Sequence, residues 1–317
     1  MVTSPEVLTE PRPRTAGAAR SRGTGPRRGA AKGRSVNLFY LPAAALFLIF
    51  TVYPLVRGVL LSFQKWDGYS PDTTFTGLSN YAHLFTDAVF TDSLLNTFIY
   101  GVGSTIIQQI IGLALAVALD RKMRGRTIAR AIIYLPVLVS PVIMGTMYYF
   151  LFQYNDGSIN DLIVALGGHK LAFFNNSTFA IAIVVIVNSL QFVGVSMVIY
   201  LAGLQSIPAE LHEAAMLDGA RGWRRFLAVT VPLLRPAFAT SIVLNLIGGL
   251  KLFDVIKVLT GGGPGYSTNS LSTLIGVEYF DNQDAGYAAA MGVALFAIIA
   301  VFTLLLNKAL NRRNLEA

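Results

Sequence analysis

The chain has 317 residues, of which 54% are hydrophobic and only 13% are charged, about half the charged share of a typical soluble domain. A globule of this composition could not cover its surface with polar side chains, which excludes the soluble, secreted, fibrous and largely disordered classes. The chain contains no cysteine, so disulfides, thiolate metal sites and thiol catalysis are excluded as well. The composition therefore predicts an integral membrane protein.

The first 36 residues differ in composition from the rest. They contain eight of the 25 lysines and arginines, two acids and no aromatic residue. Such a basic segment, rich in Gly, Ala and Pro, is predicted to be a disordered cytoplasmic tail. It has no apolar stretch followed by a cleavage site, so a removable signal peptide is not expected. We expect its charge to orient the next span rather than to bind nucleic acid.

Six apolar stretches follow, each long enough to cross a hydrocarbon core of about 30 Å as a helix. They are Leu38–Leu61, Leu94–Leu119, Ala131–Gln153, Thr178–Leu204, Ala237–Leu259 and Tyr287–Asn307. None alternates with period two, so helices are expected rather than a β-barrel. Kinks are expected at the prolines inside two of them, Pro42, Pro54, Pro136 and Pro141. The predicted fold class is all-α: a polytopic membrane protein with six transmembrane helices.

The basic residues of the connecting segments predict the orientation. With the N-terminus in the cytoplasm, the cytoplasmic segments hold twenty lysines and arginines, and the opposite segments hold only Lys65 and Lys170. The opposite segments are acidic instead, with nine aspartates and glutamates. Both termini are therefore predicted to be cytoplasmic.

Sequence motifs for catalysis are missing. The chain has no nucleophile elbow, no metalloprotease helix and no phosphate-binding loop with its lysine. The three histidines, His83, His169 and His212, are too scattered for a metal cluster. The glycine-rich run 261–268 resembles a phosphate loop only superficially, because it lacks the lysine and is predicted to lie outside the cell. We therefore expect no catalytic residue, no metal ligand and no cofactor in this chain.

The loop 205–236, between the fourth and fifth spans, carries the most information. Pro208 suits the first turn of a short helix, and Gly219 suits the position that stops it. Residues 223–229 can form a second short helix, closed by Pro232. Two short helices suit insertion into a cleft of another protein. They would offer it a small-residue face, Ala214 and Ala215, and two acids, Glu213 and Asp218. On physical grounds alone, an ordinary solvated hairpin explains the loop about as well.

Two groups of residues carry a family resemblance. The first is Glu213-Ala214-Ala215 with Asp218-Gly219 and the later Val231-Pro232, which resembles the "EAA" loop of binding-protein-dependent ABC importer permeases. The second is Phe253-Asp254 followed by residues 259–264 and Thr268, which resembles a run common in permeases of the carbohydrate-uptake branch. The resemblance covers a permease domain of residues 37–312 and leaves out the tails 1–36 and 313–317. It is closer to the first, maltose- or glycerol-phosphate-type permease of such pairs.

The resemblance implies a type I ABC importer permease fold in the bacterial cytoplasmic membrane and transport of a sugar or oligosaccharide by alternating access. It implies four kinds of partner: a second homologous permease, two cytoplasmic ABC ATPase subunits that bind ATP and Mg, an extracytoplasmic solute-binding protein and the sugar itself. The residues implied to contact the ATPase are Glu213, Ala214, Ala215, Asp218, Gly219 and Pro232.

Two other functional classes stay open. An ion-gradient-driven secondary transporter or channel would need a buried titratable relay, for which Asp254 is the only acid within a span, and would not need the Glu213 loop. A membrane scaffold or signalling subunit would show no solute accumulation at all.

Polar side chains within the spans are candidates for substrate contact, because an unpaired polar group in hydrocarbon is costly. They are Gln108, Gln109, Asn188, Gln191, Asn245, Lys251 and Asp254. Asn188 and Gln191 share a helical face, and Asp254 could pair with Lys251 or Lys257, each three residues away. Hydrogen bonds between helices explain the amides equally well, and charge neutralisation at the membrane edge explains the charged trio. Gly112 and Ala116 are expected to pack helices together.

Deleting residues 1–30 should leave transport largely intact, because this segment buries no apolar surface while twelve other basic residues still mark the cytoplasmic side. The test is an uptake assay at matched membrane abundance. A loss of more than about tenfold, or roughly 1.4 kcal/mol as an equilibrium effect, would show that the tail has a specific task.

Overall fold

The computed structural model describes residues 40–121 and 123–311, so the predictions for the tails 1–36 and 313–317 fall outside the described residues. Contacts divide the chain into two units between Tyr53 and Pro54. The described part of the first unit contains α2 (Leu41–Phe47) and a π-helical turn, Leu48–Val52. The features analysed below belong to the second unit, Pro54–Ala317.

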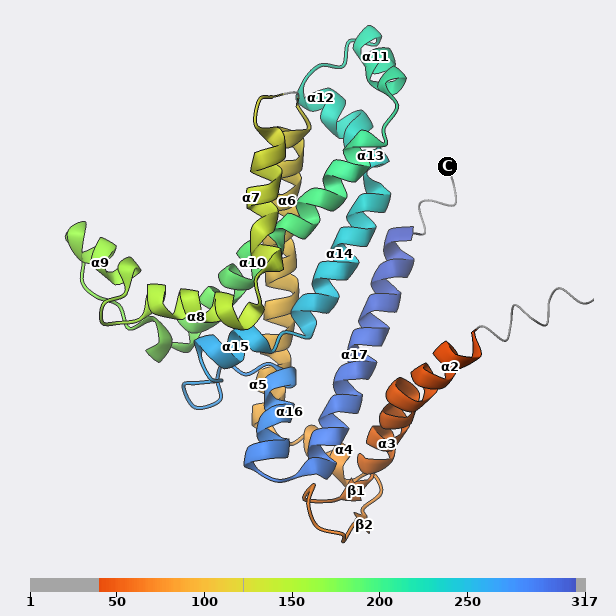
Figure 1. Cartoon of the computed structure of the whole chain (residues 1–317), viewed down its shortest axis with the longest axis vertical. Helices are drawn as coiled ribbons and strands as arrows, with labels where there is room; N and C mark the ends of the chain where they lie inside the picture. Colours follow the sequence, from red (N-terminus) through yellow and green to blue (C-terminus); the bar gives the residue numbers. More distant parts are fainter. Residues whose placement is uncertain (1–39, 122, 312–317) are drawn as a thin grey trace, which may run out of the picture. The chain divides into compact units, whose positions relative to one another are not determined.

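The second unit is built almost entirely of helices (Figure 1). In chain order they are α3 (Tyr53–Leu61), α4 (Ser79–Leu84), α5 (Ala88–Phe98), α6 (Ser104–Asp120), α7 (Arg126–Leu138), α8 (Pro141–Phe152), α9 (Ser158–Ala165), α10 (Ser177–Gln205), α11 (Ala209–Leu217), α12 (Trp223–Arg225), α13 (Val231–Leu233), α14 (Arg235–Leu250), α15 (Asp254–Leu259), α16 (Leu271–Gly276) and α17 (Ala285–Asn311). One short antiparallel pair, β1 (Gln64–Lys65) and β2 (Thr74–Phe75), follows α3.

Four helices in the described part of the chain are long and apolar enough to cross a membrane: Leu41–Leu61, Ala88–Asp120, Ser177–Gln205 and Ala285–Leu310. The second is α5 joined to α6 through a π-helical turn, Ile99–Gly103. Two further pairs of helices pass the same test together but are bent, which brings the number of candidate spans to six. The predicted all-α class and the expected six spans agree with this arrangement.

Two of the predicted spans are not straight helices. The third breaks into α7 and α8, which meet at 97°, because Pro141 disfavours the helical region for the preceding Ser140, whose backbone is extended. The fifth, predicted as Ala237–Leu259, ends as α14 at Leu250, and α15 begins at Asp254. The last turn of α14 contains Gly248 and Gly249, which are weak helix formers. The kink expected at Pro141 is therefore present as a full break, whereas the uninterrupted helix expected over Ala237–Leu259 was wrong.

Helices α6 and α10 pack closely because a glycine lies between them. A Cβ added to Gly112 on α6 would lie 2.5 Å from the Cβ of Ser196 on α10, and Ala116, one turn further along, is fully buried. The predicted packing role of Gly112 and Ala116 is confirmed. A second close contact brings Gly249 of α14 against the backbone of Gly101. Small residues give membrane helices the close approach from which much of their association energy comes.

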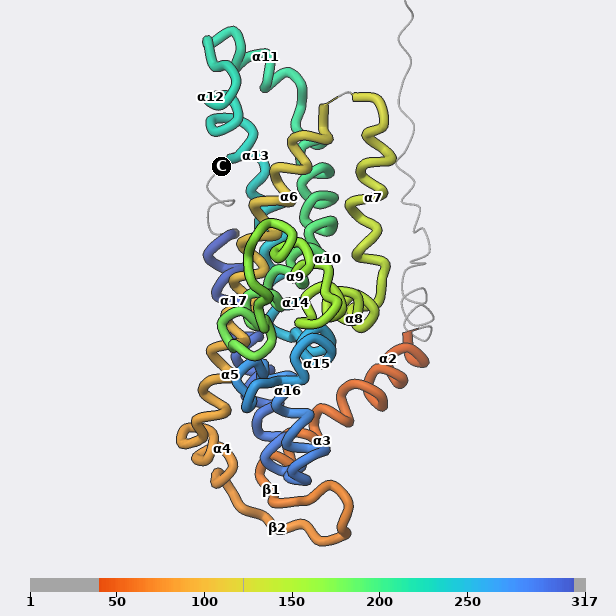
Figure 2. Tube along the Cα trace, turned by 90° about the vertical axis from the view of Figure 1, so that its left-hand side faces the viewer, coloured from red at the N-terminus to blue at the C-terminus, as the bar shows by residue number. Residues whose placement is uncertain are grey.

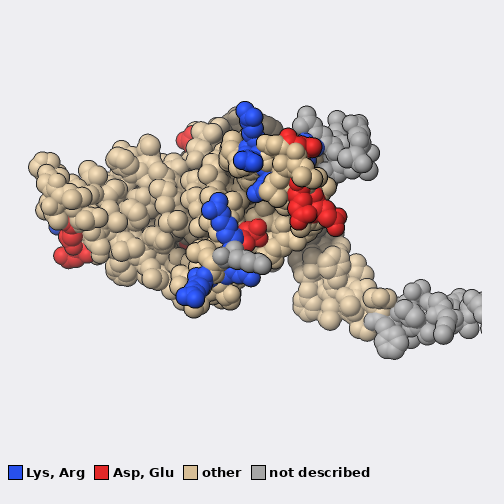
Figure 3. All heavy atoms as spheres, turned by 90° about the horizontal axis from the view of Figure 1, so that it is seen from above, with Lys and Arg blue, Asp and Glu red and all other residues tan. Residues whose placement is uncertain are grey.

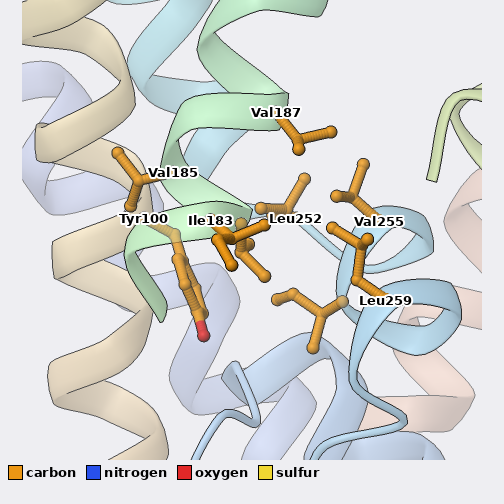
Figure 4. Close-up of a cluster of buried hydrophobic side chains, with 9 residues drawn as sticks. Tyr100, Ile183, Val185, Val187, Leu252, Val255 and Leu259 are labelled. Carbon is orange, nitrogen blue, oxygen red and sulfur yellow. The ribbon is translucent and has the colours of Figure 1, made fainter. Parts of the chain in front are cut away.

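A polar seam ties α5 to the segment before α16. The Asn96 amide donates to the carbonyls of Ser267 and Asn269, at 2.8 and 3.0 Å. The Tyr100 hydroxyl donates to the Thr268 carbonyl at 2.8 Å, and the Leu271 N–H donates to Thr97 Oγ1 at 2.8 Å. Tyr100 also joins an apolar cluster that α10 and α15 complete (Figure 4). The seam thus satisfies the backbone of a loop that the surrounding helices bury.

Replacing Gly112 with alanine should lower the Tm of the purified chain, because the new methyl group overlaps the backbone and side chain of α10. Overpacking of this kind costs about 1–3 kcal/mol. The control is Gly248→Ala, since nothing lies within 4 Å of an added Cβ at Gly248. Equal melting temperatures for the two variants would contradict the packing role of Gly112.

Candidate functional site

The loop 205–236 lies at the end of the second unit where α6 ends and α7 begins (Figures 1 and 2). We call this the basic end, defined by the connections 120–126 and 205–236. The connections 62–87 and 277–284 lie at the opposite, acidic end (Figure 1). Figure 3 views the basic end, where both basic and acidic side chains gather amid a largely uncharged surface. The basic end therefore combines charges of both signs around the loop.

Helix α11 begins directly after Pro208 and ends before Gly219, as the sequence predicted. Gly219 has a φ of +81°, and its N–H donates to the Met216 carbonyl at 3.1 Å. The N–H of Ala220 donates to the Ala215 carbonyl at 2.9 Å. These bonds satisfy carbonyls that the end of the helix leaves free. The short helix therefore has a fixed end, with open space around Gly219.

The surface of α11 is open to a partner. Glu213 and Ala214 are exposed, and Ala215 is buried against the loop. Leu217 has 89% of its side chain exposed, and Trp223 has 69%. Leu217 lies outside every candidate span, and a large apolar side chain exposed there indicates an interaction surface. The sequence analysis missed Leu217 and Trp223, although apolar residues in a polar connecting loop were the available signal.

The second short helix of the loop runs further than predicted. It comprises α12, a π-helical segment Phe226–Thr230 and α13, and Trp223 stacks on Phe226 with ring centroids 5.1 Å apart. Pro232 lies in α13, and the helical run ends one residue later, at Leu233, close to where the sequence predicted. The bend of 67° comes later, between Leu233 and Arg235.

The amide candidates within the spans are buried, and their hydrogen bonds differ. The Asn245 amide donates to Ser196 Oγ at 2.7 Å and to the Ser241 carbonyl at 2.9 Å, so its NH₂ group joins α14 to α10. Gln191 donates to the Val139 carbonyl at 3.1 Å, at the break between α7 and α8. These contacts favour the helix-packing alternative for Asn245 and for the Gln191 NH₂ group.

Three of the buried amide candidates keep hydrogen-bonding capacity, and the first is Gln108, whose Oε1 atom has no partner among the described residues. The Gln191 Oε1 atom has no partner among the described residues. Asn188 contributes its backbone carbonyl, which accepts from Gln108 Nε2 at 3.2 Å, while its side chain makes no hydrogen bond within the described part of the chain. Asn188 and Gln191 are both at least 97% buried on α10. Neither lines the cavity beside the loop 205–236, the cavity between α8 and α15 or the cavity between α3 and α17.

The charged trio does not form the pairs that its spacing suggested. Lys251 caps the end of α14, whereas Asp254 opens the separate helix α15. Because the helix is interrupted between them, a spacing of three no longer places them on one face. Asp254 makes no ion pair with Lys251 or Lys257 within the described residues, and all three side chains are exposed. A buried relay centred on Asp254, which an ion-driven transporter would need, is therefore not formed.

The glycine-rich run 261–268 is a structural loop. A Cβ at Gly262 would lie 2.3 Å from Oδ1 of Asn269, and Thr268 donates to the Gly263 carbonyl at 2.8 Å. The backbone thus folds on itself, and the carbonyls of Ser267 and Thr268 accept hydrogen bonds from Asn96 and Tyr100.

Comparison with known proteins identifies the family. Residues 108–315 match the model of the binding-protein-dependent transport system inner membrane component. The chain is 31% identical to the trehalose/maltose transport system permease protein of Thermococcus litoralis, over 86% of this chain and 92% of that protein. It is 32% identical to the arabinooligosaccharides transport system permease protein of Bacillus subtilis, over 84% of this chain and 86% of that one.

A solved structure shares the fold. A bacterial ABC transporter involved in the import of the acidic polysaccharide alginate includes a chain that superposes with a TM-score of 0.78, at 23% identity, over 89% of this chain and 96% of that one. The helical architecture, the two bent helix pairs and the exposed loop at the basic end thus occur in a chain that belongs to the inner membrane components of binding-protein-dependent transport systems, the permease subunits of ABC importers.

Proposed function

We propose that this permease forms one half of the pore of an ATP-driven importer and moves a sugar or oligosaccharide inward by alternating access. Support for the substrate class comes from relatives named for trehalose/maltose, arabinooligosaccharides and starch degradation products. The buried amides of α10 are consistent with it, because a neutral, hydroxyl-rich ligand is bound by hydrogen-bonding groups rather than by a strong charge.

A second, homologous permease would complete the pore, and a solute-binding protein would deliver the sugar on the extracytoplasmic side. Two cytoplasmic ABC ATPase subunits would hold ATP and Mg, and the basic end would face them, with both termini in the cytoplasm. The count of basic residues supports this orientation. The chain would then be a multi-pass protein of the bacterial cytoplasmic membrane.

The exposed surface of α11 is the observation that carries the coupling role. Three of its residues are exposed: the acid Glu213, the small residue Ala214 and the apolar Leu217. Only three residues separate α11 from α10, while α12 and α13 lead from it into α14. A displacement of α11 by the ATPase would therefore move α10 and α14 together, in a rigid-body transition.

The hydrogen bonds between α10 and α14 favour such a joint movement. Ser196 Oγ accepts from the Asn245 amide and from the Ser241 hydroxyl, at 2.7 and 3.1 Å. The two helices that leave the loop are thus joined within the membrane as well. A movement at the basic end would be carried to the depth of Gln191 and Asn188 by a connected pair of helices.

Charge reversal at Glu213 should uncouple the permease from its ATPase without removing it from the membrane. Glu213→Lys should reduce co-purification of the ATPase at least tenfold, about the effect of unpairing an interfacial charge. Gly219→Pro should act likewise, because proline cannot adopt a φ of +81° and removes the N–H that caps α11.

The matched control is Asp161→Lys, which makes the same charge change at an exposed acid on α9, outside the loop. It should leave co-purification unchanged. Undiminished co-purification with Glu213→Lys, together with normal uptake, would refute the docking role of the loop.

Asn188 and Gln191 are proposed to lie on the substrate pathway, since Gln191 binds the break between α7 and α8 through its NH₂ group and keeps an unpartnered Oε1. Asn188 lies one turn away on α10. Broken helices frame the substrate sites of many transporters. Asn188→Ala and Gln191→Ala should each lower uptake per molecule several-fold, since each lost hydrogen bond is worth about 0.5–1.5 kcal/mol.

The measurement is accumulation of a radiolabelled sugar, divided by the amount of folded permease. Asn245→Ala is the control, because its NH₂ group is already used between helices; it should lower the folded amount rather than the uptake per molecule. If Asn188→Ala and Gln191→Ala behave as Asn245→Ala does, they are packing residues.

A further inference from the structure

A groove at the basic end has walls of two kinds. It has a volume of about 820 Å³ and lies between α6, the end of α10 and the loop 205–236. Its apolar wall consists of Ile110, Leu113, Ala114, Val117, Leu204 and Phe226. Its mouth carries Arg121, Arg225, His212 and one acid, Asp120. The groove is therefore apolar along its length and carries a net positive charge at one end.

The apolar wall lies along α6 beside its contact with α10, and its Leu113 and Leu204 also pack against the cluster that the two helices form. Ile110, Leu113, Ala114 and Val117 recur at helical spacing on one face, whereas Gly112 and Ala116 face α10. Ile110 has 65% of its side chain exposed. Ile110 and Ala114 therefore keep exposed apolar surface in the groove, whereas Leu113 and Val117 are half-buried.

The groove has the length of one membrane leaflet. The candidate span Ala88–Asp120 ends directly before Arg121, and the basic connection 120–126 is predicted to lie on the cytoplasmic side. From Ile110 to Arg121 the helix rises about 16 Å, and half of the hydrocarbon core is about 15 Å. An acyl chain lying along α6 would therefore place its headgroup beside the two arginines.

The two arginines are free to bind an anion. Neither Arg121 nor Arg225 forms an ion pair with a carboxylate in the described part of the chain. By contrast, the neighbouring Arg130 is used within the fold, since it donates to the Leu119 carbonyl at 2.8 Å. Trp223 also lines the groove, and tryptophan is typical of the membrane–water interface.

From these observations we propose that the groove binds a phospholipid with an anionic headgroup, with an acyl chain on α6 and the phosphate on Arg121 and Arg225. Basic pockets between helices at the cytoplasmic surface bind anionic headgroups in this way. A free phosphate would leave the apolar wall uncovered, and a zwitterionic lipid would leave the positive charge unmatched. Because the loop forms one wall, the bound lipid would also touch the segment that leads from α11 to α14.

The chain offers a specific probe for this site. It has two tryptophans, and Trp66 lies far along the sequence from the groove, with its Nε1 donating to the Ser70 carbonyl. In a Trp66→Phe background, Trp223 is the only tryptophan of this chain. Its signal in the complex is the difference between this variant and Trp66→Phe/Trp223→Phe. The full-length chain, purified with the subunits that accompany it, is placed in nanodiscs that contain brominated phosphatidylglycerol or brominated phosphatidylcholine, and quenching of Trp223 is measured.

Brominated phosphatidylglycerol should quench Trp223 at an about fivefold lower mole fraction than brominated phosphatidylcholine, as expected from the binding of an anionic lipid to unpaired basic residues. The preference should disappear in Arg121→Gln/Arg225→Gln and return in Arg121→Lys/Arg225→Lys. The matched control is Arg124→Gln/Arg126→Gln, which removes two charges of the α6–α7 region outside the groove. This variant should retain the preference for brominated phosphatidylglycerol. An excess of inorganic phosphate should not relieve the quenching.

A second pair of variants tests the apolar wall. Ala114→Phe fills the groove and should weaken quenching by both lipids, whereas Ala118→Phe adds the same ring to an exposed position of α6 outside the groove and should not. Equal quenching by the two lipids, unaffected by the arginine variants, would mean contact with bulk lipid only and would overturn the proposal. Absence of quenching by either lipid would mean that another subunit covers the groove, which would overturn it as well.

Discussion

The close contact between α6 and α10 is the interaction on which the rest of the second unit depends. In a membrane, lipid chains are as apolar as leucine, so helices associate through close packing and hydrogen bonds rather than through the hydrophobic effect. Helix α10 contacts α6, α7, α8, α14 and α15, and Gly112 permits the approach that the largest of these contacts requires. Ser196 lies at the centre, since its Cβ faces Gly112 while its hydroxyl accepts from α14. One small polar residue thus joins three helices at once.

Sequence reasoning was most successful where the signal is local. Hydropathy located the spans, and the glycine after α11 marked the end of that helix, because burial in lipid and left-handed backbone each favour few residue types. Pro141 marked the kink of the third span, because a proline disfavours the helical region for the residue before it. The break at Lys251 was missed, because the residues around it are equally compatible with a straight apolar helix. The missed break also made a second prediction wrong, because the pairing expected for Asp254 assumed that the helix continued through Lys251.

The site residues show a different limit. Sequence alone cannot separate an amide that packs helices from one that meets substrate, because both tasks need the same residue types inside a span. The hydrogen bonds supply the distinction atom by atom, since the Asn245 NH₂ group is used between helices while Gln191 Oε1 is not. Leu217 and Trp223 were overlooked for a different reason: hydropathy analysis looks for apolar residues in spans, although their presence in a connecting loop was itself a signal.

The seam between α5 and the segment 267–271 has a consequence for the synthesis of the chain. Asn96 and its partner Ser267 are 171 residues apart, which at 5–20 residues per second corresponds to roughly 10–30 s of translation. During this interval the first helices are already in the membrane, and the Asn96 amide, in a segment that will be buried, has no protein carbonyl to bind. Water, lipid headgroups or the insertion machinery must solvate it until the sixth span approaches. Because the helices are synthesised in chain order, α5 can form its native hydrogen bonds only after the segment 267–271 has been synthesised.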